Sequence, residues 1–489
     1  MRLKRRTARA LFWATVQTWT ARVSGFVVLI VLGRLLGPEA YGLLAMAMIV
    51  ITFGDLFVSD SGFGEAIIQR KELNDDHCDA AFWLLLGSSV VAMAVFMVIA
   101  PLVAASFDQP LVADLVRVLS LILPLSALSA VPSALLSREL RFRALAARGF
   151  ISAAGGGIAA IGMALAGWGV WSLVGFHLVQ KALAVAVAWT AHRWRPRFSF
   201  SSRHARELWT FSIAMFGIRV LQFAEMALMR GLLGFFFGPV VLGYFFMARR
   251  VTRLMHQLLT TPTSRVALPT FAQVQADREQ AKRLLRSGIR MLGLIAVPSY
   301  AGVIVVAPIG LPLALGDEWL PAVPYLQLLA LAGLIRPVTT VQFAALRGLG
   351  MPGWSFGFEL ANAAVLAALL VGASPHGPLV MAAMVGLRPY LMLPLRAFIL
   401  HRALRFNMMR ELGDALPIYG AALVMVAAVF GWQRLALDEL PSWLVLLGAV
   451  AVGGAAYVGT TALIARDLLR QVIHLAFALR GPARRSPST

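Results

Sequence analysis

Apolar residues run through this chain in long uninterrupted stretches, separated by short polar segments rich in arginine and glycine. The stretches show no strand-like alternation, and each has about the 20 residues that a helix needs to cross a bilayer core of roughly 30 Å. The pattern therefore predicts an all-α, polytopic integral membrane protein with about fourteen transmembrane helices. The predicted spans are residues 11–33, 42–66, 80–104, 114–136, 147–166, 169–191, 210–234, 239–263, 284–308, 321–345, 353–372, 376–399, 414–432 and 441–464.

Positive charges outside the spans distinguish the two sides of the membrane. The segments on the N-terminal side hold 31 of the 44 Lys and Arg residues, whereas the opposite loops hold only Arg34 and Arg434. Cytoplasmic loops carry such an excess, so we expect both termini in the cytoplasm and an even number of spans. Arg22 interrupts the first span and no small-residue cleavage site follows it, which favours a retained signal-anchor helix over a cleaved signal peptide.

Composition narrows the class of protein further. With 59% hydrophobic and 14% charged residues, the chain is unlike both soluble enzymes and disordered chains. The net charge of +21 would normally suggest nucleic acid as a partner, but the membrane topology explains most of it, and we expect no nucleic-acid binding. The lone Cys78 excludes an intramolecular disulfide and a cysteine-based zinc cluster. The stretch DDHCD (75–79) is interpreted as a solvated loop, and neither a metal nor another cofactor is expected.

An internal repeat indicates how the spans are organised. Segment 31–47 (VLGRLLGPEAYGLLAMA) aligns without gaps to segment 232–248 (LLGFFFGPVVLGYFFMA), and both contain G-P-x3-G-x3-M-A. An even number of spans separates them, so the two blocks share one orientation, as in transporters that hold substrate between parallel repeats. The expected parts are an N-terminal six-helix lobe (1–192), a basic cytoplasmic linker (193–209), a second six-helix lobe (210–402), helices 13 and 14 (403–465) and a cytoplasmic amphipathic, basic tail (466–489).

Cations within the spans are the candidate binding groups. A charge at the bilayer centre costs roughly 2.5–3.5 kcal/mol on insertion scales, so these groups must face a hydrated or protein-lined interior. Arg249, Arg253, His256 and Thr260 also fall on one stripe at helical spacing. The candidate residues for binding the substrate in a cavity are Arg22, Lys181, Arg219, Arg249, Arg250, Arg253, His256, Arg336 and Arg388.

Acidic residues within the spans are fewer than these cations, which leaves the interior net positive. They are interpreted either as partners of the cations or as carriers of a coupling ion, and pairing is favoured. Arg22 or Lys181 would then be the partner of Asp60 or Glu65. The surplus of arginine suits phosphate, which accepts several hydrogen bonds from the planar guanidinium group. The acids concerned are Asp55, Asp60, Glu65, Glu225 and Glu359.

Prolines near Arg388 predict an irregular helix beside a binding group. Pro389 and Pro394 flank Tyr390, and proline removes a helical hydrogen bond and crowds the preceding turn. Such a break is tolerated at membrane depth where a cavity or a neighbouring helix satisfies the freed carbonyls. We interpret this segment as a hinge.

Four motifs carry a resemblance to a known family. GRLLGPEAYG (33–42), D-x4-DSGFGEAIIQRK (55–71), SRELRFRALA (137–146) and GWGVWSLV (167–174) are similar to the polysaccharide transporter family, and most of all to its colanic-acid-exporter-like branch. That family contains Wzx-type flippases for lipid-linked oligosaccharides, within the multidrug/oligosaccharidyl-lipid/polysaccharide exporter superfamily. The resemblance implies two lobes around a V-shaped cavity, a bacterial inner membrane and an undecaprenyl-diphosphate-linked glycan as substrate.

The favoured hypothesis is a flippase that moves such a glycan to the periplasmic leaflet by alternating access, beside membrane lipids and a polysaccharide polymerase or export machinery. A peptidoglycan-precursor flippase is the nearest alternative, because its substrate also carries a diphosphate. A cation-coupled multidrug exporter fits less well, because the predicted interior is cationic. A membrane enzyme is disfavoured, since the outward loops are short and no catalytic motif is present.

Overall fold

The computed structural model describes residues 2–58, 62–70, 72–198, 201–275, 277–436 and 439–464. These residues are almost entirely helical and contain no strand, which confirms the predicted all-α class. Arg22 lies in a helix, but its side chain falls outside the description. Asp60 and the predicted tail 466–489 lie outside the described residues altogether.

The chain divides into two compact units, the first ending at Met247 and the second beginning at Ala248. This boundary falls inside one long helix, α8 (Ser202–Gln273), so the six-helix lobes proposed from the sequence stay a prediction. The other helices of unit 1 are α1 (Arg2–Val58), α2 (Phe63–Gln69), α3 (Asp75–Ser106), α4 (Leu111–Leu119), α5 (Ile122–Arg138), α6 (Phe142–Leu165) and α7 (Trp171–Ala191).

Unit 2 continues from the second part of α8. Two short 3-10 helices, η1 (Asp317–Ala322) and η2 (Ser374–His376), connect longer elements. The α-helices that follow α8 are α9 (Arg278–Leu315), α10 (Val323–Leu334), α11 (Arg336–Gly348), α12 (Pro352–Ala373), α13 (Pro378–Leu391), α14 (Leu393–Leu404), α15 (Met408–Ala436) and α16 (Ser442–Ile464).

The described helices confirm the predicted number of spans. Length and composition alone give eleven candidate spans, or twelve when the bent pair α10–α11 is counted as one. Two of these, Gly25–Gln69 and Arg219–Thr260, each contain a kink where two helices join. Dividing both at the kink gives fourteen spans within the described residues, and the chain is a multi-pass membrane protein.

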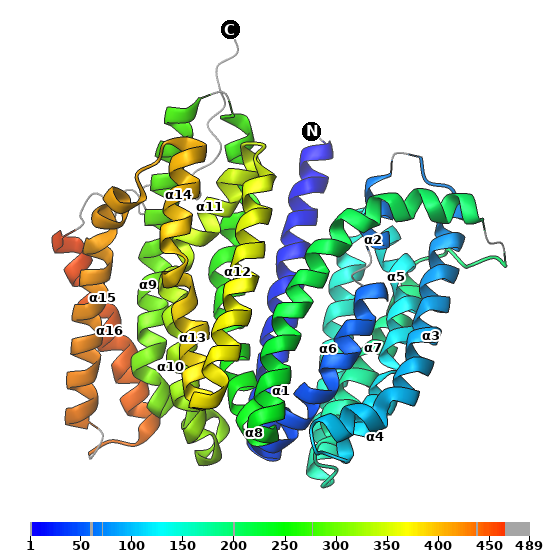
Figure 1. The fold of residues 1–489 in the computed structure, drawn as a ribbon, viewed down its shortest axis with the longest axis horizontal. Helices are drawn as coiled ribbons and strands as arrows, with labels where there is room; N and C mark the ends of the chain where they lie inside the picture. Colours follow the sequence, from blue (N-terminus) through cyan, green and yellow to red (C-terminus); the bar gives the residue numbers. More distant parts are fainter. Residues whose placement is uncertain are drawn as a thin grey trace. The chain divides into compact units, whose positions relative to one another are not determined.

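Within unit 1, helices distant in sequence pack side by side. α6 lies along α7 and also contacts α1, while α3 packs on α4 and α5 (Figure 1). The buried face of α3 contributes Phe82 and Leu85 to a core shared with Phe63 of α2 and Val131 of α5. The helices of this unit have long, continuously apolar sequences. Such sequences suit helices that contact protein on one side and lipid on the other, since the lipid-facing side needs no polar side chains.

The two kinks occur at the matched glycines of the internal repeat. Gly37 in α1 has φ 69° and ψ 178°, and Gly238 in α8 has φ 77° and ψ −177°. This backbone region is essentially restricted to glycine, and the proline that follows each glycine begins a new helical segment. The repeat therefore encodes one backbone conformation twice.

The two kinks pack against each other reciprocally within unit 1. A methyl group on Gly42 would overlap the carbonyl oxygen of Pro239, and a methyl group on Gly243 would overlap the carbonyl oxygen of Pro38. Each repeat thus presses a glycine onto the backbone of the other. Only small residues allow helix backbones in a membrane to approach this closely. We call these two contacts, Gly42 with Pro239 and Gly243 with Pro38, the paired elbows.

Unit 2 is built around α9, which contacts α10, α11, α15 and α16. Helices α15 and α16 pack on each other and bury Met425, Val429 and Ala449 with Leu294 of α9 (Figure 1). A second core joins α11, α12 and α14 through Val341, Phe358 and Leu400. Arg290 of α9 forms an ion pair with Asp414 of α15 at 2.8 Å, which adds a polar link to the apolar contact.

Candidate functional site

One span of unit 2 is bent and another is interrupted at a single residue, and arginines lie close to both places. The α10–α11 pair bends by 45°, and α11 begins at Arg336 with Pro337 in its first turn. The helices α13 and α14 meet at Met392, between Arg388 and Arg396. Proline cannot donate the hydrogen bond that would continue the helix, so Pro337 and Pro394 fix where α11 and α14 start. The irregular helix predicted beside Arg388 is observed as an interruption at Met392, and its role as a hinge stays a prediction.

The structure brings several predicted site residues together at these breaks. The charge of Arg336 lies within electrostatic range of His256 on α8, and both Arg336 and Arg388 lie within range of Arg396. Glu359 of α12 is also within range of Arg396. We call Arg336, Arg388 and Arg396 with Glu359 the unit 2 cluster. Three cations and one carboxylate leave this cluster net positive inside a membrane-spanning unit.

Arg336 occupies the start of α11, where the helix dipole adds to its charge. No side chain caps the first turn of α11, and Arg336 is exposed in the structure. Amide N–H groups at a helix N-terminus carry partial positive charge and bind anions. A broken span that starts with an arginine is therefore suited to an anionic group at membrane depth.

The stripe predicted on α8 carries an exposed arginine and, one turn further along, a half-buried histidine within electrostatic range of Arg336. Arg253 is exposed, His256 is half-buried, and Arg250 lies within electrostatic range of Arg253. The Thr260 hydroxyl donates to the carbonyl oxygen of His256 at 2.7 Å and lies 3.3 Å from its Nδ1 atom. Arg249 is half-buried one turn earlier and is engaged by a neighbouring group.

In unit 1 two predicted cations with described side chains have close partners. Lys181 of α7 donates to the Ser126 hydroxyl of α5 at 2.7 Å. Arg219 of α8 pairs with Glu65 of α2 at 3.4 Å, a pair that the sequence did not predict. Pairing thus accounts for part of the intramembrane charge, as the sequence interpretation favoured.

The remaining predicted acids are also half-buried. Asp55 of α1 and Glu225 of α8 are each engaged by at least one neighbour. Glu359 accepts a long hydrogen bond of 3.5 Å from the Asn362 amide one turn along α12. Their positions agree with either role, pairing or ion coupling, that the sequence left open.

Sequence reasoning missed Arg396, which lies near the end of the predicted span 376–399 and was counted among the 31 loop cations. It lies in α14 with only 5% of its surface exposed, and its guanidinium carbon sits 4.3 Å from the centre of the Phe358 ring. The apolar residues on both sides of it, LPL before and AFIL after, are a signal that the position lies inside a span. Arg148, at the start of the predicted span 147–166, was also counted among the loop cations, but it lies inside α6 and donates to the Ser133 hydroxyl of α5.

Two further interpretations are wrong. Arg230 lies near the end of the predicted span 210–234, from where an arginine is expected to reach the membrane surface, but it is buried at 8% exposure with its guanidinium 5.2 Å from the Phe246 ring centre. The DDHCD stretch is not a solvated loop, because it forms the first turn of α3 with His77, Cys78 and Asp79 buried. The backbone N–H of Asn74 donates to Nδ1 of His77 at 3.4 Å. Among the described side chains, no group of three His, Cys, Asp or Glu residues is placed to hold a metal.

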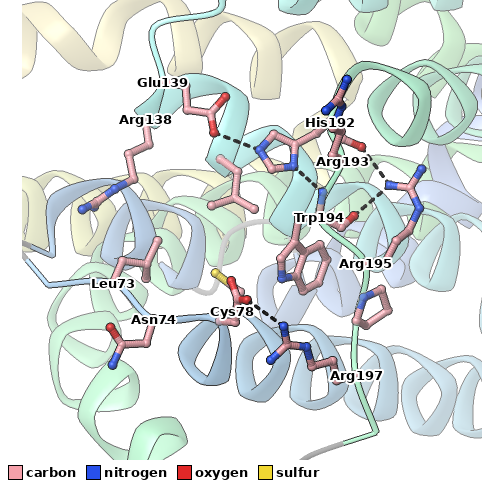
Figure 2. A pocket seen from close by; sticks show the side chains of 13 residues that line it. Leu73, Asn74, Cys78, Arg138, Glu139, His192, Arg193, Trp194, Arg195 and Arg197 are labelled. Atoms are coloured by element: carbon pink, nitrogen blue, oxygen red, sulfur yellow. Dashed lines mark hydrogen bonds and ion pairs between the residues drawn. The ribbon is translucent and has the colours of Figure 1, made fainter.

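A separate pocket of about 820 Å³ lies where the α7–α8 connector crosses the ends of α3 and α5 (Figure 2). Its arginines are used internally: Arg138 donates to the carbonyl oxygens of Ile67 and Arg70, at 2.7 and 2.6 Å. Arg195 donates to the carbonyls of His192 and Trp194, both at 2.8 Å. These contacts hold the connector against the neighbouring helices, and they leave few donors in the pocket for a ligand.

Asp79 is expected to hold this connector in place. Its buried carboxylate accepts the backbone N–H of Arg197 at 3.2 Å, so Asp79→Ala should loosen residues 193–197. We expect trypsin to cleave the variant at least several-fold faster after Arg193 or Arg197 in purified protein, whereas Arg195 is protected from trypsin by Pro196. Asp76→Ala, an exposed neighbour in the same turn, is the matched control. Equal cleavage of the two variants would show that Asp79 does not fasten the connector.

These features define a class: a multi-pass, all-helical membrane transporter fold with a cationic interior. The fold agrees with a solved structure of the lipid II flippase MurJ in an inward closed conformation, with a TM-score of 0.77, 14% identity, and coverage of 93% of this chain and 99% of that one. It also agrees with an inward-facing multidrug resistance MATE family transporter of the MOP superfamily, with a TM-score of 0.59, 14% identity, and coverage of 82% and 98%. Both likenesses concern the fold alone.

The model of the family described as "Polysaccharide biosynthesis protein" matches residues 31–324, and the chain belongs to that family. The succinoglycan biosynthesis transport protein ExoT of Rhizobium meliloti is 27% identical, over 93% of this chain and 92% of its own. The lipopolysaccharide biosynthesis protein WzxC of Escherichia coli is 25% identical, over 69% of each chain. The resemblance inferred from the four motifs is confirmed.

Proposed function

We propose that this protein is a flippase that carries an undecaprenyl-diphosphate-linked oligosaccharide from the cytoplasmic to the periplasmic leaflet of a bacterial inner membrane. The observation that carries the proposal is the cationic start of α11, where Arg336 lies within electrostatic range of His256 and next to a bend in the membrane span. Such a site suits a diphosphate. The named roles of the relatives, in succinoglycan transport and lipopolysaccharide biosynthesis, support a polysaccharide precursor as the cargo.

In this proposal both termini are cytoplasmic, as the distribution of loop cations favours. The six-helix lobes 1–192 and 210–402 rock against each other, and the headgroup crosses between them while the polyprenyl tail stays in lipid. A polysaccharide polymerase or export complex would receive the product. The protein acts by transport without a catalytic step.

Arg336→Gln, alone and combined with Arg253→Gln, tests the proposal in a strain that lacks the gene for this chain. A charge-assisted hydrogen bond contributes about 1.5–3 kcal/mol, so each lost contact should reduce transport roughly 10- to 100-fold. We expect the double variant to restore little surface polysaccharide although its abundance in the membrane is normal. Arg402→Gln, an exposed position on α14, is the control and should restore wild-type amounts. Full restoration by the double variant would refute the role of these two cations.

A peptidoglycan-precursor flippase is the alternative to separate from this function, because the fold is shared with a lipid II flippase. Expression of this chain in a strain conditionally depleted of its own lipid II flippase tests it directly. We expect no rescue of growth. Rescue at normal expression would assign the chain to the peptidoglycan precursor instead.

A further inference from the structure

The bend between α10 and α11 frees backbone carbonyl groups inside a membrane span. A helix leaves the carbonyls of its last four residues without a helical donor, and α10 ends at Leu334. The N–H of Ile335 donates to the carbonyl of Gly333, so it does not reach Leu331, its partner in a continuous helix. The bilayer core offers no water to replace such bonds, so the bend needs hydrogen-bond donors from neighbouring helices.

Two tyrosine hydroxyls supply these donors. The hydroxyl of Tyr390 in α13 donates to the carbonyl oxygen of Leu331 at 2.7 Å, and that of Tyr419 in α15 donates to the carbonyl oxygen of Leu334 at 2.9 Å. Both distances are normal for a hydroxyl donor. Helix α13 packs along α10, which brings Tyr390 within reach (Figure 1). The end of α10 is therefore held by two separate helices.

The central helix of unit 2 uses the same solution at a proline. Proline has no N–H group, so the carbonyl four residues before it loses its donor. Pro298 in α9 frees the carbonyl of Leu294 in this way, and the hydroxyl of Tyr457 in α16 donates to it at 3.0 Å. A tyrosine from a neighbouring helix thus replaces a lost backbone donor at both places, but only the bend of α10–α11 lies beside Arg336.

The bend decides where Arg336 lies. Arg336 is the second residue after Leu334 and the first residue of α11, so the direction in which α11 leaves α10 sets the position of its guanidinium group. In a continuous helix the N–H of Val338, in the first turn of α11, would bond to the carbonyl of Leu334. Tyr419 occupies that carbonyl, which leaves the first-turn N–H groups of α11 directed away from α10 and available to an anion.

We propose that Tyr390 and Tyr419 are positioning residues for the diphosphate site: by binding the carbonyls of Leu331 and Leu334 they keep the span bent and Arg336 in place. This inference rests on the proposed function, in which Arg336 binds the diphosphate headgroup. It adds that α13 and α15, which carry the two tyrosines, determine the geometry of that site. The tyrosines act through the backbone of α10 and need no contact with the cargo.

Pulsed dipolar EPR on the purified full-length protein in detergent tests the bend without substrate. Spin labels at Leu320→Cys and Arg347→Cys, two exposed positions on either side of the bend, are introduced in a Cys78→Ala background. Each arm is about 20 Å long at 1.5 Å per residue, so straightening the 45° bend should lengthen the mean distance by about 2–3 Å. We expect this increase, with a broader distribution, when Tyr390→Phe and Tyr419→Phe are combined.

Tyr300→Phe is the matched control for this measurement. Tyr300 of α9 is buried at 1% exposure, and a methyl group on Gly333 of α10 would overlap its ring. Its hydroxyl has no hydrogen-bond partner in the described part of the chain. Removing that hydroxyl should therefore leave the distance distribution unchanged, although the substitution is the same and lies beside the same helix.

Transport separates positioning from stability. The protein is reconstituted in vesicles with an undecaprenyl-diphosphate-linked glycan at several concentrations. We expect Tyr390→Phe and Tyr419→Phe each to raise the half-saturating concentration about 3- to 10-fold, the effect of one weakened hydrogen bond to the headgroup. Tyr457→Phe, which removes an equivalent bond from α9, should lower the unfolding midpoint to a similar extent but leave the half-saturating concentration unchanged. Because the tyrosines act through Arg336, adding Tyr390→Phe to Arg336→Gln should cause no further increase.

A wild-type distance distribution in the double tyrosine variant would overturn the proposal, and so would an equal rise in the half-saturating concentration in Tyr457→Phe. A further increase on top of Arg336→Gln would show that the tyrosines act elsewhere. If the double variant does not fold, the two single variants are measured in the same way. Transport by the wild type that Arg336→Gln reduces would uphold the proposed function in each of these cases. Wild-type vesicles that move no such glycan would refute the proposed function itself.

Discussion

Replacing Gly42 by alanine is expected to destabilise the protein by about 3 kcal/mol or more, at the upper end of the usual effect of overpacking. The added methyl group would overlap the backbone oxygen of Pro239, which cannot move aside like a flexible side chain. Gly243→Ala should have a similar effect, because its methyl group would overlap the oxygen of Pro38. Both substitutions separate the paired elbows.

Thermal unfolding of detergent-solubilised variants measures this effect, and we expect each midpoint to fall by roughly 3–6 °C. Because both substitutions open the same contact, the double variant should lose clearly less than the sum of the two single losses. Gly231→Ala is the control. This glycine lies within helix α8, and a methyl group added to it would meet no other part of the protein within 4 Å, so alanine there should be neutral or stabilising. Additive losses, or a loss in Gly231→Ala equal to that in Gly42→Ala, would contradict the reciprocal packing.

The paired elbows show which part of the fold the sequence can predict. The matched G-P-x3-G runs identify a repeat, and hydropathy with loop charge gives the number of spans. Neither the matched runs nor the hydropathy pattern predicts that Gly37 and Gly238 take the same positive-φ conformation, or that Gly42 contacts Pro239. Contacts between residues about 200 positions apart depend on how the helices pack, and a one-dimensional pattern carries no information about that.

The sequence predicted the kind of site, arginines inside the membrane, but only some of the residues that form it. Arg336 and His256 were expected inside the membrane, and the structure places them within electrostatic range of each other. Arg396 was not expected, because the hydropathy of a span does not distinguish an arginine near its end from one enclosed by aromatic rings. The length of α14 explains the error. This helix continues to Leu404, so Arg396 lies about two turns before its end and not at the end of the span.

The unit 2 cluster also depends on how closely α13 approaches α10. Gly386 lies two residues before Arg388, and a methyl group on it would overlap the carbonyl oxygen of Leu328. Because that atom belongs to the backbone of α10, Gly386→Ala must push the two helices apart and displace Arg388 from Arg396. We expect a loss of about 2–3 kcal/mol in stability, a midpoint lower by roughly 2–6 °C, and loss of most transport activity.

Comparing Gly386→Ala with Gly357→Ala separates this displacement from a general effect of alanine in a span. Gly357 lies in the neighbouring helix α12, is exposed, and has no atom within 4 Å of an added methyl group. Alanine there should leave both the unfolding midpoint and polysaccharide export near wild type. Wild-type stability and export in Gly386→Ala would show that α13 can move away from α10 without disturbing the cluster.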